Sequence, residues 1–539
     1  MCCRLDSLNL LTDLADLADL MFSLYLASDY HQVDMDPRYY TYLGFQWDGE
    51  FYVFRVLPFG LASAPWCFTK IMRTISLYLR FQGVRLINYL DDFLFLVSDS
   101  QFTAHRQLVL DTFKSAGLAI NESKSHLQFT RLLTHLGFVI DLDSGSFEVP
   151  LERWESLQQL ITVALSRQKV LVHLLSRIAG HLSSMILAIG PIALIKSRQC
   201  HSYLQQYSLQ FYVAISDGLR DELTYWSHLS RTHFREKIWP SPFTSDISIW
   251  CDAGATSWGA TMENQKLQAQ GFFPPELWHG TSSSTLREMW GLLHSLESFL
   301  DIIRHKSVQI FTDNSNVVRV MGQGSTDLRL NNIVLRNISI TMEHDITLLP
   351  TWVPRDQNKV ADGLTHLKDP CYWTLNADVF QKIVAPWGLP TIDRFASHSN
   401  HLLDRFNSML RCPGSVGINA LAQRDWSEHF NWCFPPFNLI PSVISIIRQF
   451  SAASILVLPL WPSSPWWPLL SKGQHFFPFV HGCRVLPRLE NLLTPGPSTA
   501  SAPRAFMRWT FLAVLCFSAK PPPQPIPIPS YACRTQVHP

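Results

Sequence analysis

The sequence has little of what marks a secreted, membrane-spanning or zinc-binding protein. Its 11 cysteines are scattered and form no C-x-x-C pair, which predicts reduced thiols and no structural zinc. The longest late apolar run, residues 509–517, is far shorter than the about 20 residues of a membrane-spanning helix. Near the start, Asp6, Asp13 and Asp16 interrupt the apolar core that a signal peptide requires. We therefore expect an intracellular protein, cytoplasmic or nuclear, with no signal peptide, transmembrane segment or membrane partner.

Charge is also sparse. Charged residues make up 16% of the 539 residues and the formal net charge is +1, so the overall composition does not mark a nucleic-acid-binding protein. Hydrophobic residues at 47% exclude general disorder and supply material for several cores. A chain of this length is expected to form several domains.

Changes in pattern divide the chain into five expected regions. An α+β region is followed by a helical connector, by a region in which strands and helices alternate, and by a region dense in Trp, Phe and Pro. The last part contains TPGPSTASAPRA and KPPPQPIPIP, which favour extended, solvated backbone, so we expect a disordered tail. The expected bounds are 1–145, 146–240, 241–368, 385–485 and 486–539.

Two adjacent acids stand in the segment VRLINYLDDFLFLV, residues 84–97. Asp91 and Asp92 lie between two apolar, strand-like runs, where burial without a cation is costly. By itself the pair also fits an exposed turn between two strands. Three further segments flank it: FRVLPFGLASAPWCFTKIM upstream, then GLAINESKS and LTHLGFVID downstream.

In this order the four segments resemble the palm motifs of reverse transcriptases. The resemblance implies a palm with an antiparallel sheet and helices, and template–primer nucleic acid as a partner. It implies that Asp91 and Asp92 are catalytic ligands of Mg²⁺. It also implies substrate-binding roles for Pro58, Phe59, Gly60 and Lys124, the last near the incoming triphosphate.

The segment FSLYLASDYHQVDM departs from that family's pattern. The family's F-S-L-D-L carries an aspartate where this chain has Tyr25, and a neutral phenol is a poor Mg²⁺ ligand. Only 24 residues precede Tyr25, where the family carries its fingers subdomain. We therefore expect a truncated fingers region and impaired polymerisation.

Four more acids follow a strand, helix, strand, helix order. Asp252 and Asp313 end strand-like runs, Glu288 lies in the first turn of a helix, and Asp362 lies on a later helix. Singly, Glu288 fits a capping box with Thr285, Asp313 fits a helix N-cap, and Asp362 fits a solvated acid. Together they strongly resemble the carboxylates of ribonuclease H.

That resemblance implies an α/β domain in which the four acids are catalytic and hold two Mg²⁺ ions. The implied reaction is cleavage of RNA paired with DNA, so an RNA–DNA hybrid is the expected partner. The loop WVPRDQN lacks the histidine that many relatives place near the last acid, so we expect slower cleavage.

Residues 390–406 and 425–450 resemble the adenine-N6 methyltransferase-like module of DIRS-type retroelements. The order of the three resemblances indicates a DIRS-type polyprotein. In active amino-methyltransferases a polar residue precedes P-P-F, whereas Phe434 stands there in this chain and accepts no hydrogen bond. No glycine-rich loop favours a site for S-adenosylmethionine, so we expect none.

The leading hypothesis is a reverse transcriptase/ribonuclease H with Mg²⁺-dependent cleavage of RNA in hybrids and impaired polymerisation. One alternative is a decayed, catalytically inactive copy that only binds nucleic acid. A second is DNA adenine methylation by the C-terminal module. The expected fold class is multidomain α+β and α/β: palm, helical thumb or connection, ribonuclease H-like fold and methyltransferase-like α/β module.

Overall fold

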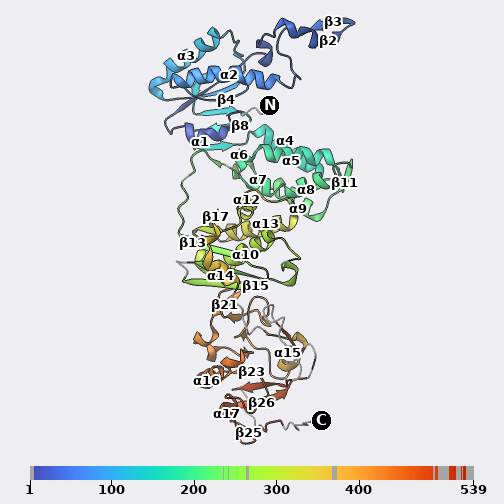
Figure 1. The fold of residues 1–539 in the computed structure, drawn as a ribbon, viewed down its shortest axis with the longest axis vertical. Coiled ribbons are helices and arrows are strands. Elements are labelled where there is room, and N and C mark those ends of the chain that lie inside the picture. Colours follow the sequence, from blue (N-terminus) through green and yellow to red (C-terminus); the bar gives the residue numbers. More distant parts are fainter. Residues whose placement is uncertain are drawn as a thin grey trace. The chain divides into compact units, whose positions relative to one another are not determined.

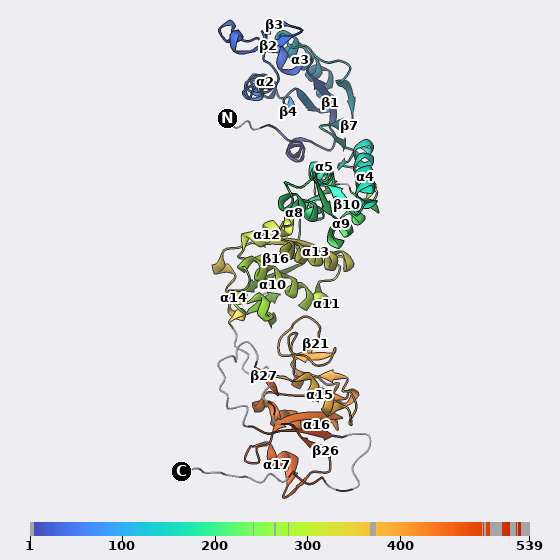
Figure 2. The ribbon, with the colours of Figure 1, turned by 90° about the vertical axis from the view of Figure 1, so that its right-hand side faces the viewer.

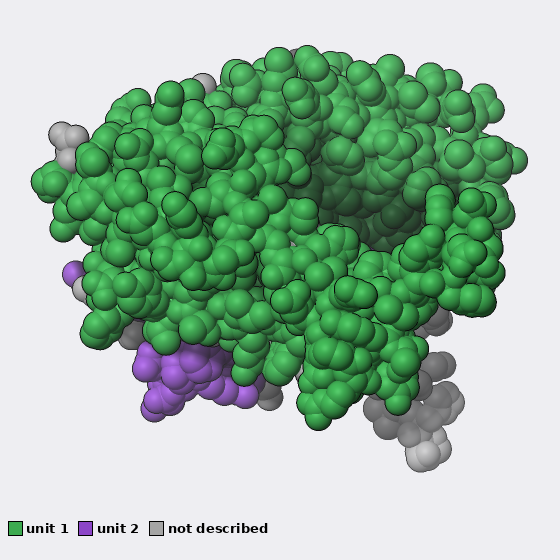
Figure 3. All heavy atoms as spheres, turned by 90° about the horizontal axis from the view of Figure 1, so that it is seen from above, with its two compact units in different colours: residues 1–242 green, residues 243–539 purple. Residues whose placement is uncertain are grey.

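The computed structural model of the chain divides into two compact units, residues 1–242 (unit 1) and residues 243–539 (unit 2). Figure 1 shows their elements along the chain, and Figure 3 shows unit 1 in green with a hollow in the face turned to the viewer. The described residues are 5–234, 236–240, 242–262, 266–278, 280–366, 373–487, 489, 492–495, 509–517, 524 and 526–529.

Unit 1 begins with an antiparallel sheet in the order β4-β5-β1-β6. Helices α2 and α3 cover one face of it (Figures 1 and 2). Apolar residues of α2 recur every three or four positions, as in Phe68, Met72 and Ile75, and pack with Phe22 and Phe95 of the sheet. The bounds are β1 (Leu20–Tyr25), β4 (Arg85–Tyr89), β5 (Asp92–Val97), β6 (His126–Thr130), α2 (Ala64–Phe81) and α3 (Phe102–Ser115). A separate ribbon joins β2 (Gly44–Trp47) and β3 (Glu50–Val53).

A second sheet and a group of helices complete unit 1. The sheet has the order β12-β9-β8-β7, and its residues share a core with the helices. The strands are β7 (Leu132–His135), β8 (Phe138–Asp141), β9 (Ser146–Glu148) and β12 (Glu236–Lys237). The longer helices are α4 (Leu151–Leu165), α5 (Val172–Ser184), α8 (Arg198–Gln206) and α9 (Asp217–Ser227), with the short pair β10 (Lys169–Leu171) and β11 (Tyr212–Ala214).

Unit 2 begins with a mixed sheet in the order β15-β14-β13-β16-β17, antiparallel from β15 to β13 and parallel from β13 to β17. Its strands are β13 (Ile247–Ala253), β14 (Ser257–Met262), β15 (Leu267–Phe272), β16 (Ser307–Thr312) and β17 (Thr347–Trp352). Its main helices are α10 (Ser284–Ser298), α12 (Ser315–Gln323), α13 (Leu328–Glu343) and α14 (Lys359–Thr365).

Neighbouring residues of β14 place α10 and α14 on opposite faces of this sheet. A Cβ on Gly291 of α10 would lie 3.5 Å from Trp258 Cβ, and a Cβ on Gly259 would lie 2.5 Å from Leu364 Cβ of α14. Successive strand residues point to opposite faces. Gly259 therefore permits the close approach of α14, the helix that carries Asp362.

The rest of unit 2 is built on a seven-stranded sheet in the order β21-β20-β19-β22-β23-β28-β26. Helix α16 (Ile440–Phe450) packs in one core with Leu456 and Leu458 of β23. Helix α15 (Ala377–Val384) packs in a second core with Ile455 and Val457 of the same strand. The strands are β19 (Ile392–Asp393), β20 (Phe406–Ser408), β21 (Ser415–Ile418), β22 (Asn431–Cys433), β23 (Ser454–Pro459), β26 (Val480–Val485) and β28 (Phe511–Cys516), and β18 (Trp373–Leu375) pairs with β27 (Leu493–Pro495).

The predicted mixed α/β fold class is confirmed, but the expected disordered tail over 486–539 is wrong in part. Residues 511–516 form β28, whose six residues are all buried between β23 and β26. The apolar run at residues 509–517 is too short to span a membrane, but a continuous apolar run of this length is what a strand buried on both faces requires. The proline-rich segments on both sides obscured that interpretation. The remainder of that region lies largely outside the described residues.

Two further expectations concern cysteines and membranes. Every cysteine among the described residues is unpaired. Within the same part of the chain, no helix combines the length and the apolar character needed to cross a bilayer.

The burial of β28 leads to a stability prediction. Val514 is fully buried and Val485, on the neighbouring β26, is 39% exposed. We expect Val514→Ala to lower the free energy of unfolding of unit 2 by about 2 kcal/mol, because it removes buried methyl groups and leaves a cavity. Val485→Ala is the matched control and should have a much smaller effect in urea unfolding. Equal effects of the two substitutions would contradict a central position for β28.

Candidate active sites and their relatives

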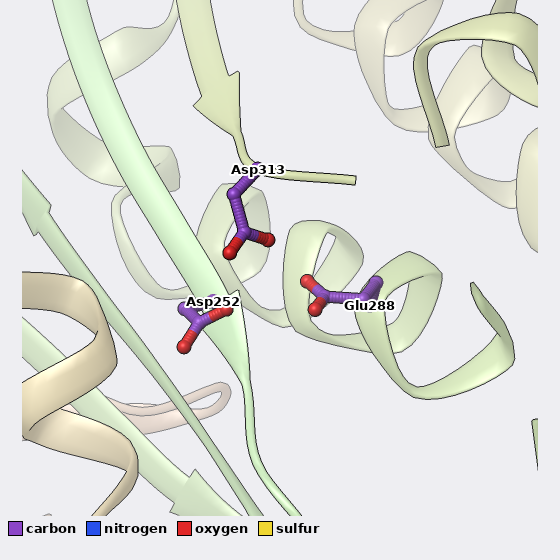
Figure 4. Close-up of side chains that lie close together, drawn as sticks. All are labelled: Asp252, Glu288 and Asp313. Atoms are coloured by element: carbon purple, nitrogen blue, oxygen red, sulfur yellow. The ribbon is translucent and has the colours of Figure 1, made fainter. Parts of the chain in front are cut away.

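Three carboxylates of unit 2 meet at one end of the mixed sheet. Asp252 lies near the carboxyl end of β13, Asp313 directly follows the parallel strand β16, and Glu288 lies in the first half of α10. One oxygen from each of the three groups lies within 4.8 Å of those of the others. Figure 4 shows the three carboxylates pointing toward one another. Because parallel strands end at the same edge of a sheet, the fold brings together acids far apart in the sequence.

Burial and mutual repulsion raise the pKa of two of these groups. Asp252 is 6% exposed and Glu288 is 7% exposed. The pKa of Asp252 is raised to about 6, mainly because the group is buried and also because the negative charges of Asp313 and Asp362 lie nearby. The pKa of Glu288 lies well above its usual range because of burial, then Asp252 and Asp313, with partial compensation by Arg287. The cluster therefore holds negative charge poorly without a compensating cation.

The donor atoms fit a hard divalent cation. Oε2 of Glu288 is buried and has no hydrogen-bond partner among the described residues, and a buried acceptor without a partner is costly. All donors of the cluster are carboxylate oxygens, the type that Mg²⁺ and Ca²⁺ prefer. The residues present therefore fit Mg²⁺.

The fourth predicted acid, Asp362, lies beside the cluster and not within it. Its Oδ1 accepts a hydrogen bond of 2.8 Å from Arg355, which lowers the pKa of Asp362. Its charge also helps to raise the pKa of Asp252. Arg355 was missed by the sequence analysis, which noted only that its loop lacks a histidine. The sequence does contain one sign of this ion pair, because the basic residue Arg355 stands seven residues before Asp362.

The local alternatives for two of these acids do not match the structure. The N-cap of α10 is Ser283, whose hydroxyl accepts from the Leu286 N–H, so Glu288 and Thr285 form no capping box. The N-cap of α12 is Asn314, not Asp313. Both acids are therefore left to face Asp252.

In unit 1 the paired acids lie at a tight hairpin. Asp92 pairs with Tyr89 across the β4–β5 turn, and Leu90 within the turn has a positive φ of 56°. On the other side of β5, Asp92 pairs with Tyr25 of β1. The fold thus places Tyr25 beside the acids, at the position where the family pattern has its third carboxylate.

Tyr25 is a neutral, half-buried phenol. Its pKa is raised to about 12, first by burial and then by Asp92 and Asp91. Its hydroxyl lies 3.4 Å from Nδ1 of His135 on β7, whose pKa is lowered to about 4 by burial. His135 was not among the predicted site residues, because no local pattern in the sequence links it to Tyr25, 110 positions away.

The other predicted residues of unit 1 lie on two loops. Lys124 is exposed in a turn whose two ends bind the backbone of Tyr25. The N–H of Asn121 donates to the Tyr25 carbonyl, and the Tyr25 N–H donates to the Ser125 hydroxyl. Pro58, Phe59 and Gly60 precede α2; the Phe59 ring is 56% exposed and Gly60 has φ +87°, which favours glycine.

In the seven-stranded domain, Phe434 directly follows β22 and its ring lies 6.4 Å from that of Phe511. At the adjacent strand ends the buried guanidinium of Arg394 donates to Asn431, Asn407 and Asp425. The cavity beside it is about 60 Å³, against about 300–1,000 Å³ for typical cofactor pockets. The residues present do not fit S-adenosylmethionine.

The acid cluster of unit 2 leads to a prediction about pH. The folded-state pKa of Asp252 is raised to about 6, so without a divalent cation its protonated form stabilises the fold. This contribution to the free energy of unfolding reaches about 3 kcal/mol. It is fully present below the unfolded-state pKa of about 4 and is lost as the pH rises through 6. We expect Asp252→Asn to melt higher than the parent at pH 8 in EDTA but not at pH 4. Equal melting temperatures at pH 8 would contradict the raised pKa.

Two family models match the chain. Residues 6–140 match the model described as reverse transcriptase (RNA-dependent DNA polymerase), and residues 245–367 match the model described as reverse transcriptase-like. Among curated proteins, the Retrovirus-related Pol polyprotein from transposon gypsy of Drosophila melanogaster is 23% identical over 361 residues, which are 65% of this chain. The chain spans about a third of that relative's length, 33%.

Solved structures of a foamy viral protease–reverse transcriptase also align with 65% of this chain. The complex with an RNA/DNA hybrid is 13% identical over 46% of its own chain, and a complex with double-stranded DNA is 15% identical over 71% of its own chain, both at a TM-score of 0.39. The family models and the gypsy relative show a chain with a reverse-transcriptase domain and a reverse-transcriptase-like, ribonuclease H-like domain, homologous to a retrotransposon Pol polyprotein.

Proposed function

We propose that this chain cleaves the RNA strand of RNA–DNA hybrids at the carboxylate cluster of unit 2. The observation that carries the proposal is the convergence of Asp252, Glu288 and Asp313, two of them buried, with oxygens within 4.8 Å of one another. Like charges held this close in a buried site favour a divalent cation over an empty state. The match of residues 245–367 to the reverse-transcriptase-like model supports the same assignment.

Each residue has a role in this proposal. Asp252, Glu288 and Asp313 would hold Mg²⁺, and Asp362 would join them once released from Arg355. Bound Mg²⁺ supplies activation of water and charge stabilisation at the leaving 3′-oxygen. Arg355 keeps Asp362 charged and beside Asp252 until the site is loaded.

For unit 1 we propose binding of template and primer with impaired polymerisation. Tyr25 supplies a neutral phenol opposite Asp92, so the pair Asp91 and Asp92 lacks a third carboxylate at that position. The match of residues 6–140 to the reverse-transcriptase model supports the ancestry. An inactive copy that only binds nucleic acid remains the alternative that the cleavage experiment tests.

For the seven-stranded domain we propose methyltransferase-like ancestry and a DIRS-type origin of the whole chain, without methylation. The mostly parallel sheet, with β28 antiparallel between β23 and β26, supports the ancestry. Phe434 and the small cavity beside Arg394 support the absence of transfer chemistry. Methylation of adenine-containing DNA by the purified chain would contradict this proposal.

The direct test of nuclease function is cleavage of a labelled RNA–DNA hybrid by the purified chain in Mg²⁺. We expect the parent to cut the RNA strand and Asp313→Asn to lose at least about a hundredfold in rate, because it removes one ligand charge. Asn316→Asp, three residues on in α12, is a charge control outside the cluster. No cleavage by a folded parent would favour the inactive copy.

The test of the palm uses Tyr25→Asp with Tyr25→Phe as its control. The aspartate restores a third carboxylate opposite Asp92, so we expect Mg²⁺ to raise the melting temperature of Tyr25→Asp and to leave that of Tyr25→Phe unchanged. Primer extension should remain below detection for the parent. Extension by the parent at rates comparable to its hybrid cleavage would refute the proposed impairment.

A further inference from the structure

A cavity of about 1120 Å³ lies within unit 2, apart from the acid cluster. Its wall is formed by α10, α13, the segment after β15 and the loop that connects β19 with β20. The next loop, between β20 and β21, supplies Pro413 and Gly414 to the wall and is held in place. Arg411 of this loop forms an ion pair of 2.8 Å with Asp301, and the Arg411 carbonyl accepts a hydrogen bond of 3.0 Å from the Gln270 N–H. The cavity is large enough for an organic ligand of drug size.

The cavity lies on a different side of α10 from the acid cluster. Trp290, His294 and Glu297 line it and recur at helical spacing, so they share one stripe of the helix. Glu288 is two residues before Trp290, a turn of about 200° around the helix axis. The two sites therefore use different faces of the same helix.

Aromatic rings from both sheets of unit 2 line part of the cavity. Phe272, Trp278 and Trp290 come from the first domain of unit 2, and Phe406 comes from the second, where the His401 ring stacks on it at 4.7 Å and 3°. Flat rings that line a cavity favour a planar ligand that stacks on them. The size and the walls together indicate a heteroaromatic ring system.

Three imidazoles supply the polar part of the wall. Nδ1 of His294 lies 3.0 Å from a Glu297 carboxylate oxygen, Nδ1 of His398 lies 3.2 Å from the Pro413 carbonyl, and Nδ1 of His401 lies 3.2 Å from the Leu403 carbonyl. Carboxylates and carbonyls only accept, so each Nδ1 donates, and the Nε2 atom of such a ring is an acceptor in its neutral form. Burial, then His294, lowers the pKa of His398, which favours its neutral form. The ligand must therefore bring N–H or O–H donors.

Charge limits the ligand further. Arg336 is the cation of the wall, and its guanidinium bonds to Glu297 at 3.1 Å and lies 5.1 Å from the Trp290 ring centre. Asp404 adds a second carboxylate to the wall. With the positive charge of Arg336 compensated and two acids present, a phosphate group is disfavoured within the cavity.

We propose that this cavity binds an amino-substituted nucleobase, stacked between the aromatic walls with its N–H groups donating to imidazole Nε2 atoms. Adenine, cytosine and guanine have the required planar ring and donors, and they enter as a free nucleoside or as an unpaired base of a strand. The site adds a function that cleavage at Asp252 does not require. Its failure would leave the nuclease proposal intact, because the two are measured separately.

The test is calorimetric titration of the full chain with adenosine and with N6,N6-dimethyladenosine, which lacks the amino donor. We expect adenosine to bind about three- to tenfold more tightly, the ratio that one net hydrogen bond supplies. AMP should bind no better than adenosine. Equal binding of adenosine and the dimethyl analogue would overturn the proposal, and so would the absence of binding by both adenosine and oligoadenylate.

Variants locate the site and distinguish the two sources. His398→Phe keeps a ring but removes an acceptor, and His401→Phe does the same at an exposed position that tolerates substitution. Met342→Ala, 73% exposed on α13, is the control. If only oligoadenylate binds, and both histidine variants weaken it at least threefold while Met342→Ala does not, the base comes from a strand. If neither ligand responds to the histidine variants, the cavity does not bind nucleobases. Hybrid cleavage is followed in the same variants and should remain at the parent's rate.

Discussion

The repulsion among buried carboxylates is the constraint on which the functional part of unit 2 depends. Asp252, Glu288 and Asp313 are brought together by two parallel strands and one helix, in surroundings that raise the pKa of the first two. The core of the sheet stabilises this arrangement although the arrangement itself is unfavourable without a cation. Arg355, through Asp362, and Arg287, beside Glu288, offset only part of this charge.

The two acidic sites of the chain differ in how that repulsion is relieved. In unit 1, a phenol stands at the position opposite Asp92, its hydroxyl is near a buried His135, and it contributes no charge. In unit 2 three acids converge instead, and Oε2 of Glu288 is buried without a hydrogen-bond partner among the described residues. The uncompensated negative charge is therefore greater in the cluster of unit 2 than at the hairpin of unit 1.

In the seven-stranded sheet of unit 2, the side chain of Arg394 occupies space near the strand ends. The buried guanidinium of Arg394 is satisfied by Asn407, Asn431 and Asp425 and lies 4.8 Å from the Trp426 ring centre. A buried cation with complete partners is stable, and it leaves little space at the strand ends where doubly wound folds hold ligands. The large cavity lies elsewhere, between α10 and the loops on either side of β20.

The sequence by itself determined the identity and order of the acids, the departure at Tyr25 and the α/β class, because these depend on residue type and on local periodicity. It also indicated the strands that end at Asp252 and Asp313, since apolar runs of that length mark buried strands. Only the tertiary structure decided that three acids converge while Asp362 bonds to Arg355, that His135 lies against Tyr25, and that residues 511–516 form a central strand. The physical reason is that these contacts join residues far apart in the chain, and their pairing is set by sheet topology and burial, which no local pattern encodes.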